Sequence, residues 1–254
     1  MASGTTYYPA PGAVAMPWNE YGSMKTAYHT DPASRSMNPI TTGTSVLGIK
    51  FDGGVAIAAD MLGSYGSLAR FPGVPRLSKV NPKTVIGFGG DYADGQYLME
   101  SLELMMIEND IQDDGIHYTP EAIYSFIRFY LYKRRSDFNP LWNTVVVGGY
   151  DKGKSFLGYV DKIGTAYEED CIGTGFGMHI AVPMMRKALE ANPALTQVEA
   201  VKLLQDCLKV LFYRDARSIN KYEIAVITED GVAIDSGLSC ETNWEIAHLI
   251  KGYE

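Results

Sequence analysis

The stretch TSVLGIKFDGGVAIAA, residues 44–59, holds two runs of strand-forming residues on either side of a short turn. The runs cover residues 44–50 and 54–59, and Phe51-Asp52-Gly53 separates them. An Asp-Gly pair between two such runs is a strong hairpin signal, because both residues tolerate the backbone angles that a tight turn needs. The stretch therefore predicts two antiparallel strands at the start of the folded body.

More strand-like and helix-like segments follow this hairpin. Thr119-Pro120-Glu121 predicts a helix start, with a threonine cap, proline in the first position and an acid in the first turn. Thr196-Gln197-Val198-Glu199 is a capping box that predicts another, and Pro183 is expected near the start or at a kink of the helix before it. Strand-like runs cover residues 84–88, 144–149, 155–160, 223–228 and 232–235, and helix-like stripes cover residues 98–106, 119–130, 184–189, 196–211 and 244–250.

The order of these segments is strands, two helices, strands, two helices, strands. Blocks joined by hairpins, rather than alternating strand–helix–strand units, favour antiparallel sheets. Two sheets packed face to face, with a helix pair on each outer side, would cover every apolar face. We therefore predict an α+β fold with four layers, αββα.

Residues 1–43 differ in texture from the rest. They are rich in Pro, Tyr, Ser, Thr, Gly and Met and lack periodic apolar spacing. Such a segment buries too little surface to offset the entropy lost on ordering. We expect a flexible leader followed by one folded domain over residues 44–254.

Composition excludes several classes of protein. The net charge of −8 and the absence of a long basic stretch argue against nucleic acid as a partner. Lys133-Arg134-Arg135 is better explained as the last turn of a helix. Three widely spaced cysteines suggest buried thiols in a reducing compartment, and no signal peptide or membrane span is evident. We expect a soluble protein of the cytoplasm and nucleus that binds no membrane.

The common enzyme motifs are missing. No phosphate loop, zincin or hydrolase-elbow pattern occurs. Gly173-Thr174-Gly175-Phe176-Gly177 precedes a helix, but it lacks the dinucleotide spacing and follows an acidic loop instead of a clear strand. His29, His117, His179 and His248 are isolated and fit structural or surface roles. We expect neither a cofactor nor a metal.

A better candidate site involves Thr44, where the polar leader meets the first strand. A threonine freed at a chain terminus carries a nucleophilic hydroxyl and its own amine as base. Asp60, Gly90, Asp215 and Ser218 follow predicted strands and a helix and could converge on it. The alternative is that these residues only cap helices and form turns.

Five motifs, in this order and spacing, resemble the proteasome beta-subunit family. They are Thr42-Gly43-Thr44-Ser45, Ala58-Ala59-Asp60, Gly89-Gly90-Asp91, Gly173-Thr174-Gly175 and Tyr213-Arg214-Asp215-Ala216-Arg217-Ser218. The resemblance runs from Thr44 to the end of the chain, and it implies the sandwich fold of N-terminal nucleophile hydrolases. Two further segments, residues 59–67 and 139–143, are similar to one non-catalytic subunit type of that family.

In active members of this family, a freed threonine attacks the peptide carbonyl. The resemblance places that threonine at Thr44, the flanking aspartate at Asp60 and the oxyanion glycine at Gly90. It also places a supporting hydroxyl at Thr174 and the later pair at Asp215 and Ser218. These positions are expected to be vestigial here, for the following reason.

Arg76 stands where active members carry a lysine. A buried lysine can exchange a proton near a nucleophile, whereas arginine stays protonated and presents a broad fork that would crowd Thr44. We expect Arg76 to anchor Asp60 as an ion pair. A second departure is Ile219-Asn220, where active members carry glycines.

The leader is expected to be trimmed upstream of Thr44. The resemblance implies cleavage by active neighbours near Arg35-Ser36, so residues 1–35 would be removed. An extension of residues 36–43 would remain, deny Thr44 a free amine and cover its pocket.

The sequence thus favours a non-catalytic, structural beta subunit of the proteasome core particle. Its implied partners are beta subunits of the same and the opposite ring, and subunits of the alpha ring. One alternative is an active threonine peptidase with Thr44 as nucleophile, and another is an unrelated amidase of the same fold.

Overall fold

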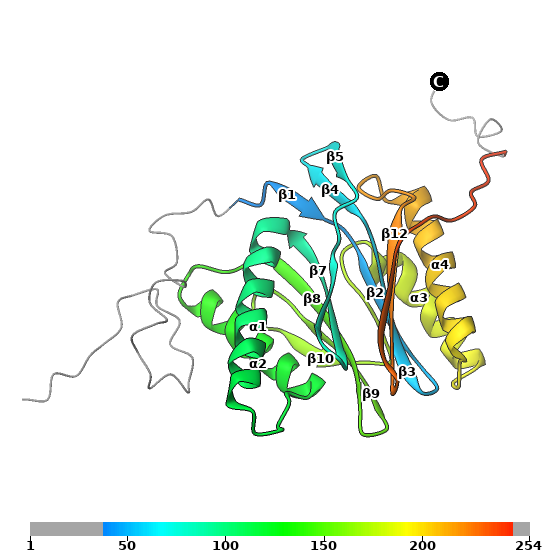
Figure 1. Cartoon of the computed structure of the whole chain (residues 1–254). Helices are drawn as coiled ribbons and strands as arrows, with labels where there is room; N and C mark the ends of the chain where they lie inside the picture. The colour runs from blue at the N-terminus through cyan, green and yellow to red at the C-terminus, as the bar shows by residue number, and fades with distance from the viewer. Residues whose placement is uncertain (1–37, 246–254) are drawn as a thin grey trace, which may run out of the picture. The chain divides into compact units, whose positions relative to one another are not determined.

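The computed structural model describes residues 38–245, and from Pro39 onward they form one compact unit (Figure 1). Arg35, Ser36, His29, His248 and most of the helix predicted at residues 244–250 lie outside the described residues. Within the described range no helix is long and apolar enough to cross a membrane.

The described residues form two antiparallel sheets and four helices. The first sheet has the order β10-β9-β8-β7-β1-β4-β5, with β6 also paired to β7, and the second has the order β11-β2-β3-β12-β13. The strands of the first sheet are β1 (Thr41–Gly43), β4 (Leu62–Tyr65), β5 (Leu68–Pro72), β6 (Leu77–Asn81), β7 (Thr84–Asp91), β8 (Asn143–Asp151), β9 (Lys154–Val160) and β10 (Ala166–Glu168). Those of the second are β2 (Val46–Phe51), β3 (Gly54–Asp60), β11 (Cys171–Gly173), β12 (Tyr222–Thr228) and β13 (Gly231–Leu238).

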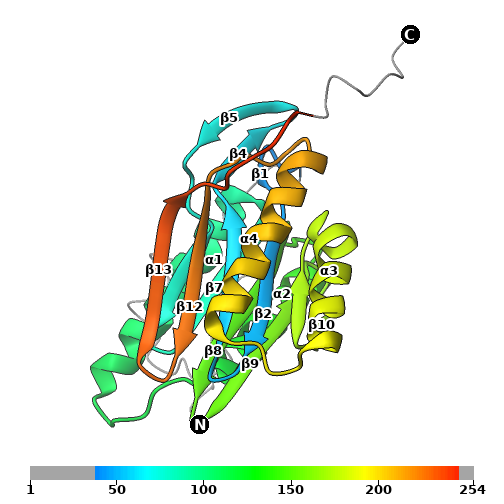
Figure 2. The same ribbon diagram turned by 90° about the vertical axis from the view of Figure 1, so that its right-hand side faces the viewer.

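The helices cover the outer faces of the sheets, as Figures 1 and 2 show. Helices α1 (Tyr92–Gln112) and α2 (Pro120–Ser136) pack on the first sheet, and α3 (Gly177–Ala191) and α4 (Gln197–Arg214) pack on the second. The predicted four-layer α+β sandwich is therefore confirmed.

Strands β2 and β3 are nearly continuous apolar runs because both of their faces are buried. Val55 and Ile57 of β3 face the other sheet, whereas Ala56 and Ala58 face the helices. Both faces of a strand in this position are buried, so neither face can be polar. The predicted turn lies between Phe51 and Gly54, which pair with each other across the hairpin.

The predicted helix starts are confirmed. Thr119 caps α2, and Thr196 forms both halves of the capping box of α4 with Glu199. Lys133-Arg134-Arg135 lies in the last turn of α2. Positive charges there stabilise the helix, because they interact favourably with the negative end of its dipole. Pro183 lies inside α3, because that helix starts earlier, at Gly177.

The predicted leader extends too far. Residues 41–43 form strand β1, which pairs with β4 on one side and β7 on the other. Strands β4, β5, β6, β10 and β11 were also absent from the sequence-based scheme. These strands are short, and all of β5 is exposed. They form because neighbouring strands pair with them, and no apolar run in the sequence marks them.

Candidate functional site

Thr44 lies between β1 and β2, close to the carboxylate that follows α4. Its hydroxyl Oγ1 donates a hydrogen bond of 2.6 Å to Oδ2 of Asp215. Its nitrogen is in the peptide bond with Gly43, which belongs to β1. The site thus brings Thr44 and Asp215 together but provides no free amine in the full chain.

Asp60 ends β3, and Arg76 precedes β6. Both side chains are buried, and they form an ion pair between Nη2 of Arg76 and Oδ1 of Asp60. Burial is the main cause that raises the pKa of Asp60 above its ordinary value, while Arg76 opposes this rise. The geometry confirms the predicted ion pair between these two residues.

The other donors of the Arg76 guanidinium go to backbone carbonyls. Nε donates to the carbonyl of Asp60 at 2.9 Å, Nη1 to that of Thr44 at 2.8 Å and Nη2 to that of Ser45 at 2.9 Å. A guanidinium presents five N–H donors in a planar fork on three nitrogens, whereas a lysine ammonium presents three donors on one nitrogen and could not reach all of these carbonyls at once. Arg76 therefore ties the two residues that lead into β2 to the last residue of β3.

Glu223, at the start of β12, completes this buried cluster and was missed by the sequence reasoning. Its Oε1 accepts the N–H groups of Arg76 at 2.5 Å and of Leu77 at 2.6 Å. Burial raises its pKa, and the two accepted N–H bonds oppose that rise. A carboxylate at the edge of the apolar run 223–228 was the available signal, but nothing local indicated its partners.

Gly90 adopts a backbone conformation that a side chain would not tolerate. Its φ is +89°, and an added Cβ would lie 2.0 Å from the carbonyl oxygen of Trp142. Together with Thr44, Thr174 and His179 it lines an open hollow of about 510 Å³. Gly90 and Thr44 thus share one concavity, as the resemblance implies.

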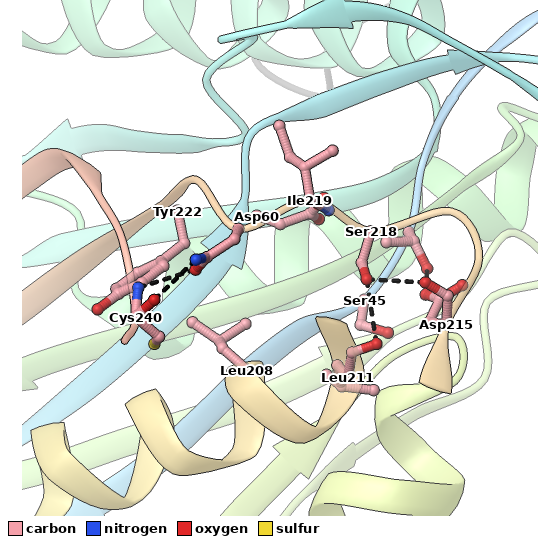
Figure 3. Close-up of a pocket in the computed structure, with 11 residues that line it drawn as sticks. Ser45, Asp60, Leu208, Leu211, Asp215, Ser218, Ile219, Tyr222 and Cys240 are labelled. Carbon is pink, nitrogen blue, oxygen red and sulfur yellow. Dashed lines mark hydrogen bonds between the residues drawn. The ribbon is translucent and has the colours of Figure 1, made fainter. Parts of the chain in front are cut away.

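The hydroxyl groups of Thr174 and Ser218 form hydrogen bonds with the backbone. Oγ1 of Thr174 accepts the N–H of Val46 at 2.8 Å. Oγ of Ser218 contacts the carbonyl oxygens of Leu211 at 3.1 Å and Asp215 at 2.8 Å (Figure 3). These two hydroxyls therefore support the loops around Thr44 without a bond to its Oγ1.

A much smaller cavity, of about 10 Å³, is lined by Thr44, by Asp60 and by Leu208 and Leu211 of α4. Figure 3 shows Asp60 and the α4 residues around it. Ile219 and Asn220 line it, at the positions where active family members carry glycines. The N–H of Ile219 donates to Oδ2 of Asp60 at 3.3 Å, so this loop is also joined to the buried cluster. Little space remains beside Asp60 for a reacting group.

The glycine-rich turn before α3 has a packing role. It follows strand β11, contrary to the expected acidic loop. The N–H of Gly177 donates to Oγ of Ser45 at 2.8 Å, and a Cβ on Gly177 would lie 2.7 Å from Leu47. The glycines therefore allow α3 to approach β2, and nothing in this contact requires a nucleotide.

The two histidines within the described range, His117 and His179, are exposed. Among the residues that the structure describes, no group of three or more His, Cys, Asp or Glu side chains is placed to hold a metal ion. The reactive groups that the structure brings together here are the hydroxyl of Thr44 and the carboxylate of Asp215, beside a guanidinium that cannot accept a proton.

Comparisons with known proteins point to a single family. The family model described as "Proteasome subunit" matches residues 40–227. A proteasome subunit beta type-4 of Xenopus laevis is 56% identical over 223 residues, which cover 88% of this chain and 92% of that protein. A proteasome subunit beta type-4 of Dictyostelium discoideum is 46% identical over 84% of this chain and 83% of its own length. A proteasome subunit beta type-7 of Saccharomyces cerevisiae is 39% identical over 92% of both chains.

Proposed function

The chain belongs to the proteasome subunit family, and from this premise we propose that it is a non-catalytic, structural beta subunit of the proteasome core particle. Its role is to help build the chamber in which sibling subunits cut peptides. The chain by itself is not a peptidase.

The observation that carries this proposal is the burial of Arg76 behind Thr44. A threonine nucleophile needs a nearby group that takes its proton and gives it back. Arg76 occupies the lysine position, is fully buried, and has its donors bound to Asp60, Thr44 and Ser45. Loss of one member of a cooperating catalytic unit typically costs several orders of magnitude in rate.

The alternative of an active threonine peptidase has one observation in its favour. The hydroxyl of Thr44 points at a carboxylate, Asp215, that could accept its proton. However, the nitrogen of Thr44 is held in a peptide bond, and β1 runs directly into it. The comparisons give no support to an unrelated amidase, since the matched proteins are named as proteasome subunits.

Assembly with other proteasome subunits follows from the family. The specific contacts, with beta subunits of the same and the opposite ring and with the alpha ring, are part of the proposal. Support comes from apolar side chains that the chain's own core does not use: Phe129 is 60% exposed and Tyr132 51% exposed on α2, and Phe138 just beyond it is 92% exposed. Large apolar side chains exposed to this extent are typical of surfaces that a partner covers.

Two further parts of the proposal concern the life of the chain. We propose residence in the cytoplasm and nucleus, which the three free cysteines support. We also propose trimming near Arg35-Ser36, with residues 36–43 retained in the mature subunit. The first residue of the mature chain, determined from assembled particles, tests this.

An activity probe tests the non-catalytic assignment. Assembled particles are treated with an electrophile that modifies terminal threonines, and each subunit is then analysed by mass spectrometry. We expect adducts on catalytic siblings, which serve as the internal control, and none on Thr44. An adduct on Thr44 would overturn the assignment.

A further inference from the structure

We propose that Phe138, two residues beyond the end of α2, is an anchor side chain that inserts into an apolar pocket of a neighbouring proteasome subunit. The rim of that pocket carries carboxylates. This inference rests on the proposed function, because it names one contact through which the chain joins the particle.

The backbone of Phe138 has a left-handed conformation, with a φ of +54°. Among the residues that the structure describes, Asp113 and Lys152 are the other two non-glycine residues with a positive φ. In this conformation Cβ lies too close to the following carbonyl oxygen, and glycine, asparagine and aspartate are the residues that adopt it most readily. Local preference therefore does not explain a phenylalanine at this position.

Hydrogen bonds at the end of α2 impose this conformation. The N–H of Phe138 donates to the carbonyl of Arg135 at 3.1 Å. The N–H of Asn139 donates to the carbonyl of Arg134 at 3.0 Å. These two bonds form a Schellman motif, whose left-handed position is usually a glycine and sometimes an asparagine. Phenylalanine thus stands where the motif favours glycine.

The ring of Phe138 gives the chain itself little in return. Its side chain is 92% exposed, so burial within this chain does not offset the unfavourable backbone conformation. Backbone conformations of this kind gather at functional sites, where the surrounding structure imposes them. A partner that covers the ring would supply the missing burial, because aromatic side chains that fill a pocket dominate the energy of many interfaces.

The backbone beneath the ring is held in place from both sides. Nε of Arg134 donates to the carbonyl of Asn139 at 3.0 Å, and the Arg134 side chain is buried. Cζ of Arg134 lies 5.7 Å from the centroid of the Tyr97 ring on α1. Leu141, just before β8, is also buried. The loop is therefore ordered before it meets a partner, which reduces the entropy lost on association.

Exposed charges on α2 indicate the chemistry of the partner. Between residues 128 and 138 the exposed charged side chains are Arg128, Arg135 and Asp137. The two arginines are seven residues apart and so lie on one face of the helix, with Tyr132 between them. Cations outnumber the acid, so a partner surface with carboxylates around an apolar pocket is complementary. Because the family assembles with other proteasome subunits, the occupant is a sibling subunit.

The test compares full-length variants in assembled particles. Phe138→Gly and Phe138→Asn both suit the left-handed position but remove the ring. Lys152→Gly is the matched control: its φ of +49° is also positive, and the change removes no apolar side chain. Each tagged chain is expressed together with the other subunits, and its share in particles is measured after native separation. The urea unfolding midpoint and the sedimentation of the isolated chain are measured in parallel.

We expect both Phe138 variants to unfold at a urea concentration equal to or higher than that of the parent, because the backbone strain is relieved and little burial is lost. Their share in particles should fall about tenfold or more, as for an interface hot spot. Lys152→Gly should incorporate like the parent.

Parental incorporation of both Phe138 variants would overturn the inference and leave the proposed function intact. Failure of the parent itself to enter particles would instead contradict the proposed function. Lower unfolding midpoints for both Phe138 variants would also overturn the inference, because the ring would then stabilise the chain itself. So would self-association of the isolated parent that Phe138→Gly abolishes, because the occupant would then be a second copy of this chain.

Discussion

Arg76 shares its buried position with two carboxylates. Asp60 meets the guanidinium directly, and Glu223 accepts backbone N–H groups at the start of β6. Taking charges out of water is costly, so such clusters persist only where nearly every donor and acceptor is satisfied. Here the bonds of Arg76 and Glu223 join the start of β2, the end of β3, the start of β6 and β12. The position that holds a catalytic lysine in active family members thus has a structural role in this chain.

The buried carboxyl of Glu223 should make the stability of the protein depend on pH. Burial raises its pKa above the ordinary 4.5. A carboxyl with a raised pKa stabilises the folded state at low pH, and this stabilisation is lost as the pH rises through the pKa of the folded state. We expect the free energy of unfolding of Glu223→Gln to rise relative to the parent as pH increases above about 4.5. Urea unfolding at a series of pH values measures this.

The control for this prediction is Glu199→Gln. Hydrogen bonds from Thr196 lower the pKa of Glu199, so its contribution is present above its ordinary pKa and is lost as pH falls. The relative stability of this variant should therefore change in the opposite direction with pH. Parallel pH profiles for Glu223→Gln and the parent would contradict the prediction.

At the scale of elements, the end of strand β7 contains a position that only glycine can occupy without strain. Near its end Gly90 takes a positive φ and passes against the carbonyl of Trp142, just before Asp91 caps α1. The resemblance assigns this glycine to an oxyanion site. The structure provides an independent reason for glycine here, so its presence is not by itself a sign of catalysis.

Gly90→Ala tests this structural requirement. A Cβ costs about 1–2 kcal/mol at a left-handed position and a similar amount more where it overpacks, so we expect a loss of about 3 kcal/mol. Gly66→Ala is the matched control: its φ of +60° is also positive, but no atom lies within 4 Å of the added Cβ. Chemical denaturation should show a loss of only about 1 kcal/mol for Gly66→Ala. Equal losses would show that the contact with Trp142 does not matter.

At the scale of the whole molecule, the outer face of α2 is the part that the fold leaves unexplained. Phe129 and Tyr132 are half exposed or more on a helix whose opposite face supplies Ile123 and Ile127 to the core. Tyr132 does have a contact within the chain, because Cζ of Arg135 lies 5.5 Å from the centroid of its ring. The exposed ring of Phe129 is what the proposed assembly with other subunits would cover.

Phe129→Asp therefore separates folding from assembly. The side chain is 60% exposed, so we expect the circular dichroism spectrum and the unfolding midpoint of the isolated chain to stay close to those of the parent. Incorporation into assembled particles should fall about tenfold or more if the ring is a hot spot. Phe129→Leu, which keeps an apolar side chain, should incorporate nearly as well as the parent. Parental incorporation of the aspartate variant would exclude this face as an interface.

Local signals in the sequence predicted most of the long elements. The Asp-Gly turn, the caps at Thr119 and Thr196 and the apolar stripes each act within a few residues. The short strands were out of reach, because β1 and β5 have no apolar run of their own. The ion pair of Asp60 with Arg76 was expected from the family resemblance, whereas the part played by Glu223 was not.

The sequence by itself determined the sandwich, its helix pairs and the family, because periodicity, capping and motif order are properties of the chain. Only the tertiary structure showed that Glu223 joins Asp60 and Arg76 beside Thr44, because these residues come from separate strands and loops. It also decided that the residues before Thr44 form a strand between β4 and β7. The reason is physical: burial and long-range pairing depend on neighbours far along the chain, which no local pattern specifies.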